Sequence, residues 1–524
     1  MTKFVYCFFR VVRTCLEILS CMIFRLISKW TPRKSLPPIS NLLLLESATS
    51  LAAKIRDRKV TSQEVVAAFI DRIKEINPIL NCVVETRFDE ALKEAEALDC
   101  ELRNTSKDNE TLAKETPFLG VPFSMKECFQ VKGLHQTSGL YGRRDIVAEE
   151  DADVVRLLKK AGCILVCTTN VPELCMWWET SNTIYGRTNN PYNPMCIVGG
   201  SSGGEACLQS ACGSPFGVGS DIGGSIRMPA FFNGIFGHKG SVGLISNRGQ
   251  MPAAVGSLEK MLATGPLCKH AADLRPSLKI MAAENATLVD LDKKVKPENM
   301  RIFYIEDDGG SCFTTPVQHE LRAAMRAVVS HLQLTHRVTA KKLQLKELRN
   351  ILPMYLAMMG SEKQAPKFSQ EMVMRKGSLC LWWESVKWLL GQSHHTFPAL
   401  ALSALEKVTS DDDPRAVELL KQAGALREKL KEILGDDGVL LFQSHPTVAP
   451  YHCQPLFRFF NFCYTALFNL AYLPVTQCPL GLSKAGLPLG VQIVANDKND
   501  HLCLSLAEEL EKSFGGWVCP SVVE

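Results

Sequence analysis

Two glycine-flanked serine clusters hold the residues best suited to chemistry. The first reads Gly-Gly-Ser-Ser-Gly-Gly-Glu at 199–205, and the second reads Asp-Ile-Gly-Gly-Ser-Ile-Arg at 221–227. Glycine lets the backbone approach a ligand closely, and consecutive N–H groups in such a loop can hold a developing negative charge. A serine at the end of such a loop is a candidate nucleophile. The stretch therefore predicts acyl transfer.

A serine nucleophile needs a base, and no histidine falls in this stretch before His238. Upstream, residues 118–127 hold a mainly apolar run followed by Lys126 and Glu127. This pattern predicts a buried strand that ends in a lysine. Desolvation favours the neutral form of a lysine side chain, and the neutral amine can act as a base. The alternative is a solvated surface charge, which this pattern alone leaves open.

The serine stretch has three other interpretations. The first is a flexible linker, but the interposed apolar residues Leu208, Phe216 and Val218 indicate buried structure instead. The second is a phosphate-binding loop, which is disfavoured because the sequence contains no G-x-x-x-x-G-K-[ST] string. Residues 199–203 do satisfy G-x-S-x-G, which would make Ser201 the nucleophile of an α/β-hydrolase.

Lys126 followed by the two serine motifs, in this order and spacing, resembles the amidase-signature family of serine hydrolases. Family-like segments run from about Leu42 to the C-terminus. Within that family, residues 228–237, 445–450 and 515–520 are similar to those of the fatty-acid amide hydrolases. Two positions depart from the family pattern: Glu127 stands where many members have aspartate, and Gly240 stands where proline is usual.

The resemblance implies that Ser225 is the acylated nucleophile, Ser201 the bridging serine and Lys126 the base. It also implies an oxyanion hole made by the backbone N–H groups of Ile222, Gly223, Gly224 and Ser225. Ser202 and Arg227 are expected to support this network. Met176 and Trp177 are expected to line the acyl side of the pocket, with ordinary core packing as the alternative.

The implied reaction is the hydrolysis of fatty-acid amides, namely long-chain acyl primary amides and N-acyl ethanolamines, to a free fatty acid and an amine. The resemblance implies no cofactor and no metal ion. The same motifs would serve a glutamine amidotransferase subunit, which needs a partner protein, and the Ser201-based α/β-hydrolase is a second alternative. A non-catalytic binding protein would need one of the three catalytic residues replaced, and none is.

The composition limits which classes of protein this sequence can form. The 524 residues are 46% hydrophobic and 22% charged, and 59 basic against 55 acidic residues give a net charge of +4. This balance argues against a nucleic-acid surface. The 20 cysteines include no C-x-x-C pair, which favours free thiols over zinc ligands. No Gly/Ser-rich or Pro-rich linker divides the chain after Leu42, so residues 42–524 are predicted to form one catalytic domain.

The first 31 residues have the pattern of an amphipathic membrane-anchoring helix. Its apolar residues cover one half of a helical wheel, and Lys3, Arg10, Arg13 and Glu17 lie on the other half. A tilted single membrane span is the alternative. Residues 32–41 read as a Pro-rich linker. We therefore expect a membrane-associated protein, at an intracellular membrane or a lipid droplet, whose partners are a lipid amide, the membrane surface and a second copy in a homodimer.

The coarse pattern predicts an α/β protein with a large twisted mixed β-sheet covered by helices on both faces. A capping box at 61–64 opens a helix that is expected to stop before Pro78. A second helix is expected at 90–102, followed by a polar loop at 104–114. Strands near 118–125 and 163–168 flank a helix at 151–161. Residues 280–440 are expected to be mainly helical, with 381–390 and 397–405 either core or a membrane-docking cap.

Overall fold

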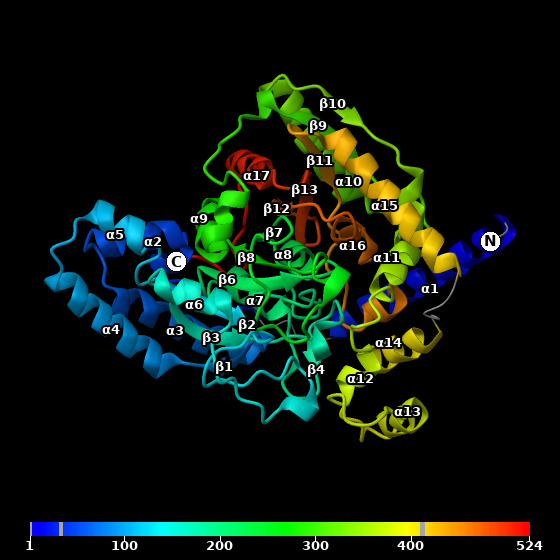
Figure 1. Cartoon of the computed structure of the whole chain (residues 1–524), viewed down its shortest axis with the longest axis horizontal. Coiled ribbons are helices and arrows are strands. Elements are labelled where there is room, and N and C mark those ends of the chain that lie inside the picture. The colour runs from blue at the N-terminus through cyan, green and yellow to red at the C-terminus, as the bar shows by residue number, and fades with distance from the viewer. Residues whose placement is uncertain (1–2, 31–34, 409–413) are drawn as a thin grey trace.

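One large mixed sheet runs through the protein. The computed structural model describes residues 3–30, 35–408 and 414–524. The eleven strands of this sheet follow the order β1-β3-β2-β6-β8-β7-β12-β13-β11-β9-β10 (Figure 1). Their bounds are β1 (Val83–Thr86), β2 (Pro122–Lys126), β3 (Ile164–Thr169), β6 (Phe216–Asp221), β7 (Phe236–Lys239), β8 (Ala263–Cys268), β9 (Arg301–Ile305), β10 (Ala340–Lys342), β11 (Gly438–Phe442), β12 (Val475–Leu482) and β13 (Pro488–Ala495).

The sheet is mixed because β2 pairs in parallel with β3 and with β6, whereas β6 pairs antiparallel with β8. Both of its faces are covered. Along β11, Val439 and Leu441 pack into one hydrophobic cluster while Leu440 and Phe442 pack into another. Successive strand residues point to opposite faces, so each face carries its own core. The predicted fold class is confirmed.

Helices surround this sheet (Figure 1). They are α1 (Lys3–Trp30), α2 (Ala48–Arg56), α3 (Ser62–Leu80), α4 (Phe88–Asn104), α5 (Asn109–Glu115), α6 (Asp153–Lys160), α7 (Gly203–Ser210), α8 (Arg227–Phe232), α9 (Leu274–Ala282), α10 (His319–Thr335), α11 (Ile351–Met359), α12 (Phe368–Met372), α13 (Leu381–Leu389), α14 (Phe397–Val408), α15 (Pro414–Leu434), α16 (Cys463–Leu470) and α17 (Asp500–Phe514). A small separate hairpin joins β4 (Ser181–Asn182) and β5 (Gly186–Arg187).

Local signals predicted several element starts and missed some ends. The capping box between Thr61 and Glu64 is present at the start of α3. The expected stop before Pro78 is wrong, because α3 continues to Leu80 and ends at Asn81 in a left-handed conformation. A proline in the last turn removes one helical hydrogen bond only.

Two other expectations also need correction. The polar loop predicted at 104–114 contains α5, whose first turn is capped by the side chain of Asp108 accepting from the Thr111 N–H at 2.8 Å. Residues 280–440 are largely helical, but they also supply the parallel strands β9, β10 and β11 at one edge of the sheet. The strands at 118–125 and 163–168 and the helix at 151–161 are confirmed as β2, β3 and α6.

The N-terminal helix α1 docks on the protein through its polar side. Glu17 is buried and accepts a hydrogen bond from Thr315 Oγ1 at 2.6 Å, and Arg13 donates to the Cys312 carbonyl at 3.4 Å. The apolar side is left outside: Leu16, Ile18, Leu19, Met22, Ile23 and Leu26 are 48–60% exposed. Among the described residues, no helix is long and apolar enough to cross a membrane.

The Pro-rich segment follows α1, and residues 32–34 of it lie outside the described part of the chain, as do residues 1, 2 and 31. Its later part is bound to the C-terminal residues of the chain. The Ile39 N–H donates to the Val522 carbonyl at 2.8 Å, and the Glu524 N–H donates to the Ile39 carbonyl at 3.0 Å. This contact fixes the point at which the N-terminal segment leaves the domain.

The segments at 381–390 and 397–405 differ in how far their side chains are buried. α13 has no buried residue, and Trp382 and Leu389 are 74% and 76% exposed, so core packing is excluded for this helix. α14 instead buries Ala399 and Leu400 in a small hydrophobic cluster that includes Leu174. α14 thus anchors a hairpin whose other helix faces outward. In Figure 1, α1 and α13 both lie on the right of the molecule.

Candidate active site

Lys126 is the last residue of β2, at the edge of the sheet where parallel strands β2 and β3 end together. Its side chain is fully buried. The Nζ atom lies 2.7 Å from Ser201 Oγ and 3.0 Å from Ser220 Oγ. The alternative of a solvated surface charge is therefore wrong, and the structure brings Lys126 and Ser201 into direct hydrogen-bond contact.

Ser201 and Ser202 lie in the loop that leads into α7, and the Gly200–Ser201 peptide bond is cis. The Ser202 N–H donates to the Ser225 carbonyl at 3.1 Å, which joins the two serine motifs through their backbones. The Ser202 hydroxyl also lies 3.4 Å from the backbone N of Ser220. A Cβ at Gly219 would come within 2.6 Å of Ser202 Oγ, so glycine is needed there for the two loops to approach.

Ser225 lies in the turn between β6 and α8. Gly224 before it has a φ of +127°, and a Cβ there would lie 2.0 Å from Thr465 Oγ1, so glycine is required on both counts. Ser225 is 9% exposed, whereas Ser201 is 1% and Lys126 0% exposed. Ser225 is thus the most accessible of the three. Among the described residues, no hydrogen bond links its hydroxyl to Ser201.

A buried ion pair shapes the Ser225 turn. The carboxylate of Asp221 lies 2.8 Å from Arg227 Nη2, and it also accepts from the backbone N–H groups of Gly224 at 2.8 Å and Ile226 at 3.0 Å. Asn469 donates to the same carboxylate at 2.9 Å. Burial alone would raise the pKa of Asp221, but Arg227 and Asn469 outweigh burial and hold that pKa below its ordinary value. The turn is therefore built around a permanent negative charge.

The expected oxyanion donors differ in their availability. The Gly224 N–H is already directed at Asp221. The N–H groups of Ile222, Gly223 and Ser225 have no hydrogen-bond acceptor among the described residues. These three donors are therefore the ones left to hold a developing oxyanion in the turn.

Two cysteines beside the lysine are not predicted from the sequence. Cys175 lies within hydrogen-bond reach of Cys128 and Ser201 and close to the charge of Lys126. The hydrogen bond with Cys128 lowers the pKa of the Cys175 thiol to about 7, against the effect of burial. Cys128 Sγ lies 3.9 Å from Ser220 Oγ. Neither position carries a local motif, and only the fold brings them to Lys126.

A buried carboxyl group also lies beneath the lysine. Glu205 in α7 accepts hydrogen bonds from Ser124 at 2.7 Å, Gln209 at 2.8 Å and Thr169 at 2.8 Å. Burial raises its pKa to about 7, although these hydrogen bonds oppose the shift. Glu205 belongs to the first serine motif, yet the motif does not predict its role as the support of β2 and β3. A charged residue inside an otherwise small and polar motif is the signal that could have indicated it.

The two departures from the family pattern have structural roles. The Glu127 carboxylate accepts the backbone N–H groups of Thr137 and Ser138, which holds that loop against the end of β2. Burial raises the pKa of Glu127 to about 8 against these hydrogen bonds. After Lys239, Gly240 is followed by Ser241, whose N–H donates to Asp500 at 2.9 Å. Asp500 thus holds this turn in the absence of the usual proline.

The aromatic segment after β3 is buried at Trp178 and only partly buried just before it. Trp178 is buried, and its Nε1–H donates to the Phe459 carbonyl at 3.2 Å. Cys175, Met176 and Trp177 are half-buried. Glu173 at the start of this segment binds the hairpin between α13 and α14, because its carboxylate lies 2.6 Å from His395 Nδ1 and accepts the Thr396 N–H at 2.8 Å. The segment therefore connects the neighbourhood of Lys126 to the exposed helix.

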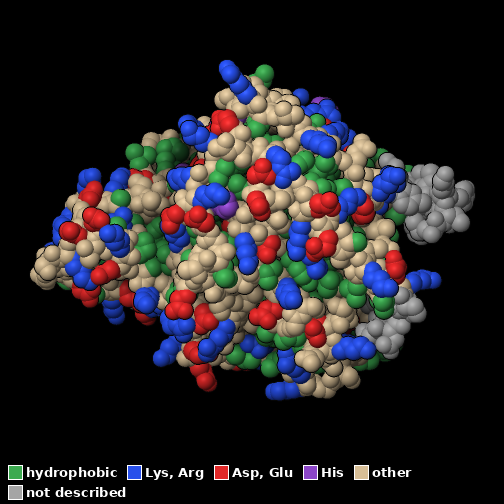
Figure 2. Space-filling view, turned by 45° about the horizontal axis from the view of Figure 1, so that its top comes forward, with side chains coloured by type: hydrophobic (Ala, Val, Ile, Leu, Met, Phe, Trp, Pro, Cys, Tyr) green, Lys and Arg blue, Asp and Glu red, His purple; other side chains and the backbone are tan. Residues whose placement is uncertain are grey.

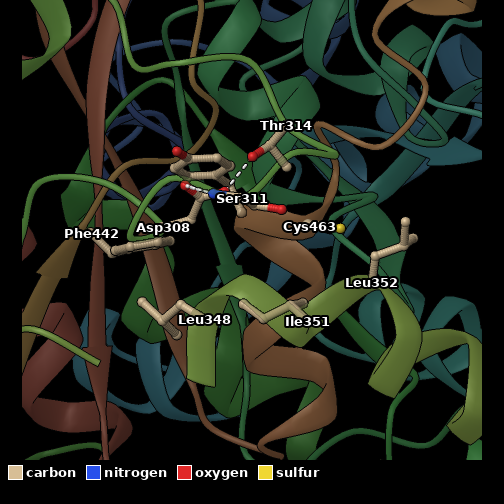
Figure 3. A pocket seen from close by; sticks show the side chains of 9 residues that line it. Asp308, Ser311, Thr314, Leu348, Ile351, Leu352, Phe442 and Cys463 are labelled. Carbon is tan, nitrogen blue, oxygen red and sulfur yellow. Dashed lines mark hydrogen bonds between the residues drawn. The ribbon is translucent and has the colours of Figure 1, made fainter. Parts of the chain in front are cut away.

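A small cavity elsewhere contains none of the predicted site residues (Figure 3). Its volume of about 10 Å³ leaves room for one water molecule. Asp308 accepts from Ser311 and Thr314 on its polar side, and α11 supplies apolar side chains on the other. The cavity adjoins Thr315, the residue that binds Glu17 of α1.

Comparisons with known proteins show the family of this chain. A family model described as amidase matches residues 64–504. The chain belongs to the amidase family, and it is an amide hydrolase. Fatty-acid amide hydrolase 2 of Homo sapiens is 48% identical over 494 residues, which cover 94% of this chain and 92% of that protein.

Solved structures confirm the fold. A structure of fatty acid amide hydrolase has a TM-score of 0.71 at 23% identity and covers 91% of this chain and 86% of its own. A glutamyl-tRNA(Gln) amidotransferase subunit from Thermotoga maritima has a TM-score of 0.70 at 22% identity and covers 93% of this chain and 100% of its own. Because both kinds of enzyme share the fold, the fold alone does not select the substrate.

Proposed function

We propose that this protein is a serine amidase that hydrolyses long-chain fatty-acid amides, primary amides and N-acyl ethanolamines among them, to a fatty acid and an amine. Ser225 is the nucleophile, Ser201 the bridging serine and Lys126 the base. The observation that carries the proposal is the contact of 2.7 Å between Lys126 Nζ and Ser201 Oγ inside a fully buried cluster. Ser225 is the accessible serine beside it.

The acylation step moves one proton along this cluster. Ser225 Oγ attacks the amide carbonyl carbon as its proton passes to Ser201, whose own proton passes to the neutral amine of Lys126. The N–H groups of Ile222, Gly223 and Ser225 hold the oxyanion. The C–N bond then breaks, and the proton returns from Lys126 through Ser201 to the departing nitrogen. Water releases the fatty acid from Ser225 by the same proton path.

The Ser201-based α/β-hydrolase is disfavoured by the partner of Ser201. Its hydroxyl contacts Lys126, and no histidine among the described residues forms a hydrogen bond with it. The experiment is to label the purified protein with a fluorophosphonate and to map the modified serine by mass spectrometry. We expect the label on Ser225 and none on Ser225→Ala. Label on Ser201 would overturn the assignment of the nucleophile.

The preference for a lipid substrate is supported by the relative named above and by two exposed apolar helices. α1 docks through Glu17 with its apolar side outward, and α13 exposes Trp382 and Leu389. We propose that these helices bind a membrane surface, from which a long acyl chain enters beside residues 173–178. Removal of residues 1–30 should shift the protein toward the soluble fraction while turnover of a short water-soluble amide persists. Loss of that turnover would instead show a structural role for α1.

A long-chain amide should also be turned over in preference to glutamine. The matched assay compares ammonia release from a long-chain primary amide and from free glutamine with the same enzyme preparation. An added methylene in an apolar pocket contributes about 1–3 kcal/mol at most, so kcat/KM should rise with acyl length. Ammonia release from glutamine that exceeds release from the lipid amide would favour the amidotransferase alternative.

A further inference from the structure

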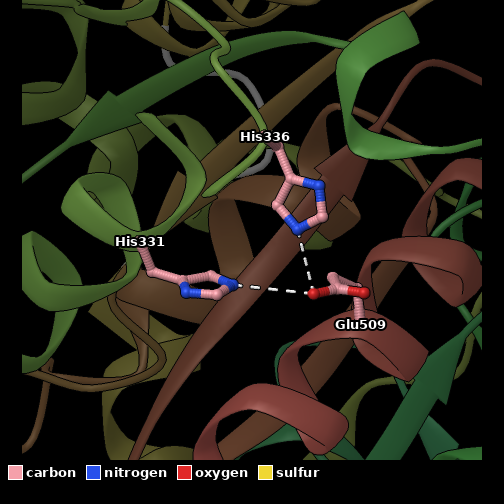
Figure 4. A group of neighbouring side chains, drawn as sticks. All are labelled: His331, His336 and Glu509. Atoms are coloured by element: carbon pink, nitrogen blue, oxygen red, sulfur yellow. Dashed lines mark hydrogen bonds and ion pairs between the residues drawn. The ribbon is translucent and has the colours of Figure 1, made fainter. Parts of the chain in front are cut away.

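A second group of titratable side chains lies on elements that carry none of the proposed catalytic residues. His331 is in the last turns of α10, His336 follows the end of that helix, and Glu509 is in α17. One nitrogen or oxygen atom from each of the three lies within 4.8 Å of the other two. Figure 4 shows both imidazole rings directed at the Glu509 carboxylate.

The three atoms are arranged around one point. Glu509 Oε1 lies 2.9 Å from His336 Nε2 and 3.6 Å from His331 Nε2. Ligands bound tetrahedrally at about 2.0–2.1 Å from a zinc ion stand roughly 3.3 Å apart. Small side-chain rotations would therefore bring these atoms to coordination distance. Two imidazole nitrogens and one carboxylate oxygen form a donor set suited to zinc and similar divalent transition metals.

The remote nitrogens of the two imidazole rings have partners, and the Glu509 oxygen that faces both rings has one more. His336 Nδ1 lies 2.7 Å from Glu298 Oε1, and His331 Nδ1 lies 3.3 Å from Thr335 Oγ1. Ser513 donates to Glu509 Oε1 at 2.9 Å. A carboxylate on Nδ1 of a histidine fixes the ring and its tautomer so that Nε2 is presented to a metal ion. The group thus has outer partners of the kind found around metal ligands.

An ion pair alone accounts for only part of this arrangement. With a proton on each ring nitrogen, His336 would be satisfied by Glu298 and Glu509. His331 Nε2 is different, because it is buried and has no hydrogen-bond partner among the described residues. Phe514 packs edge-on against the His331 ring, with ring centroids 5.5 Å apart. A cation between the three side chains would use the open nitrogen as well.

We propose that His331, His336 and Glu509 bind one divalent transition metal ion of the zinc class. Three protein ligands leave a fourth position for water. The ion would join the end of α10, which covers one part of the sheet, to the C-terminal helix α17. Because no proposed catalytic residue lies in α10 or α17, the test of this site is independent of the proposed amidase reaction.

The test measures zinc binding to the purified full-length protein after removal of any affinity tag, by competition with a chromogenic chelator. We expect one site per chain in the wild type that is lost in His331→Ala and in His336→Ala. His319→Ala is the matched control, since His319 is exposed at the other end of the same helix and should leave binding unchanged. A circular-dichroism spectrum like that of the wild type shows that each variant is folded.

Two further measurements separate this site from binding by cysteines. Cobalt bound by two histidines and a carboxylate gives weak visible bands without the intense near-ultraviolet band of a thiolate complex. Glu298→Gln should weaken zinc affinity about tenfold while one site per chain remains. The proposal is overturned if the wild type competes for no zinc, if the two alanine variants bind as tightly as the wild type, or if the cobalt spectrum shows thiolate ligation.

Discussion

The buried cluster around Lys126, Asp221 and Arg227 and the two outward helices α1 and α13 invert the usual distribution of side chains in opposite ways. In the cluster, Lys126, Asp221 and Arg227 are ionisable residues with no exposed surface. On α1 and α13, leucine, isoleucine and tryptophan side chains face outward. Charged residues are rarely buried without partners, and large apolar patches are rarely left uncovered. Each region therefore depends on something that compensates for its unfavourable environment.

The buried ionisable residues are compensated by other groups of the protein, whereas the exposed apolar helices need a partner outside it. Asp221 and Arg227 are satisfied by each other, by Asn469 and by backbone N–H groups. The apolar side of α1 is held away from the core because Glu17 binds Thr315. On our proposal, a lipid surface covers it. Changes in the cluster should thus impair activity or folding in any assay, whereas changes on the helices should matter only where lipid is present.

The largest effect is expected for Lys126→Ala. Removal of a general base costs about 10²–10⁴-fold in rate. The loss should be greater for an amide than for the matching ester, because an ester oxygen leaves without needing the returned proton. The measurement is kcat/KM for an amide and an ester of the same acyl chain, both soluble. Normal amide turnover by Lys126→Ala would contradict the proposed base.

The second effect is on stability, through the ion pair beneath Ser225. Arg227→Met leaves the Asp221 carboxylate buried without its cation, which should lower the free energy of unfolding by about 3–5 kcal/mol. Adding Asp221→Asn to Arg227→Met should recover part of this loss, because the uncompensated charge is gone. Chemical denaturation of the two variants and the wild type checks both steps. A single variant within about 1 kcal/mol of the wild type would show that the pair is not needed to hold the turn.

These two regions also differ in how far the sequence predicts them. Lys126, Ser201 and Ser225 are identified by residue type and order within short motifs, and the capping box at Thr61 predicts the start of α3. The partners of Asp221 are not predictable in this way, because Asn469 comes from a helix far along the chain. The docking of α1 is similar. The helical wheel separates its two sides, but only the fold shows that Thr315 receives Glu17 and turns the apolar side outward.

The third effect tests the outward helices. Replacing Trp382, Trp383 and Trp388 with aspartate removes apolar surface that would be buried in lipid, each side chain contributing about 1.5–3 kcal/mol when fully buried. Turnover of a long-chain amide in vesicles should fall at least roughly ten- to a hundredfold, which corresponds to the loss of one such side chain. Turnover of a short soluble amide should stay unchanged. The measured quantity is the ratio of the two rates.

The matched control for that variant is Leu334→Asp. Leu334 is 82% exposed at the end of α10, outside both apolar helices. Its replacement adds the same kind of charge to the surface and should leave the ratio of vesicle to soluble turnover as in the wild type. An equal fall in the control and the tryptophan variant would mean that charge alone weakens lipid binding. An unchanged ratio in the tryptophan variant would mean that substrate enters elsewhere.

The smallest effect concerns a buried polar group that carries no charge. His445 packs against Trp178 and Phe232, with ring centroids 5.3 and 5.0 Å away, and burial lowers its pKa from 6.5 to about 3 while nearby Arg458 adds to the shift. Between pH 6.5 and 3 the unfolded chain therefore binds a proton here that the folded protein does not. The contribution of His445 to stability is complete above pH 6.5 and is lost as the pH falls.

His445→Asn keeps a hydrogen-bond acceptor near the position of Nδ1 but does not titrate. From pH 7 to pH 5.5, the wild type should lose about 1.3 kcal/mol more unfolding free energy than this variant. Other titrating groups act on both proteins and cancel in the difference. Denaturant unfolding at the two pH values gives the result. Equal losses would mean that His445 is protonated inside the fold, and the buried region would then hold one more charge than its hydrogen bonds are arranged to satisfy.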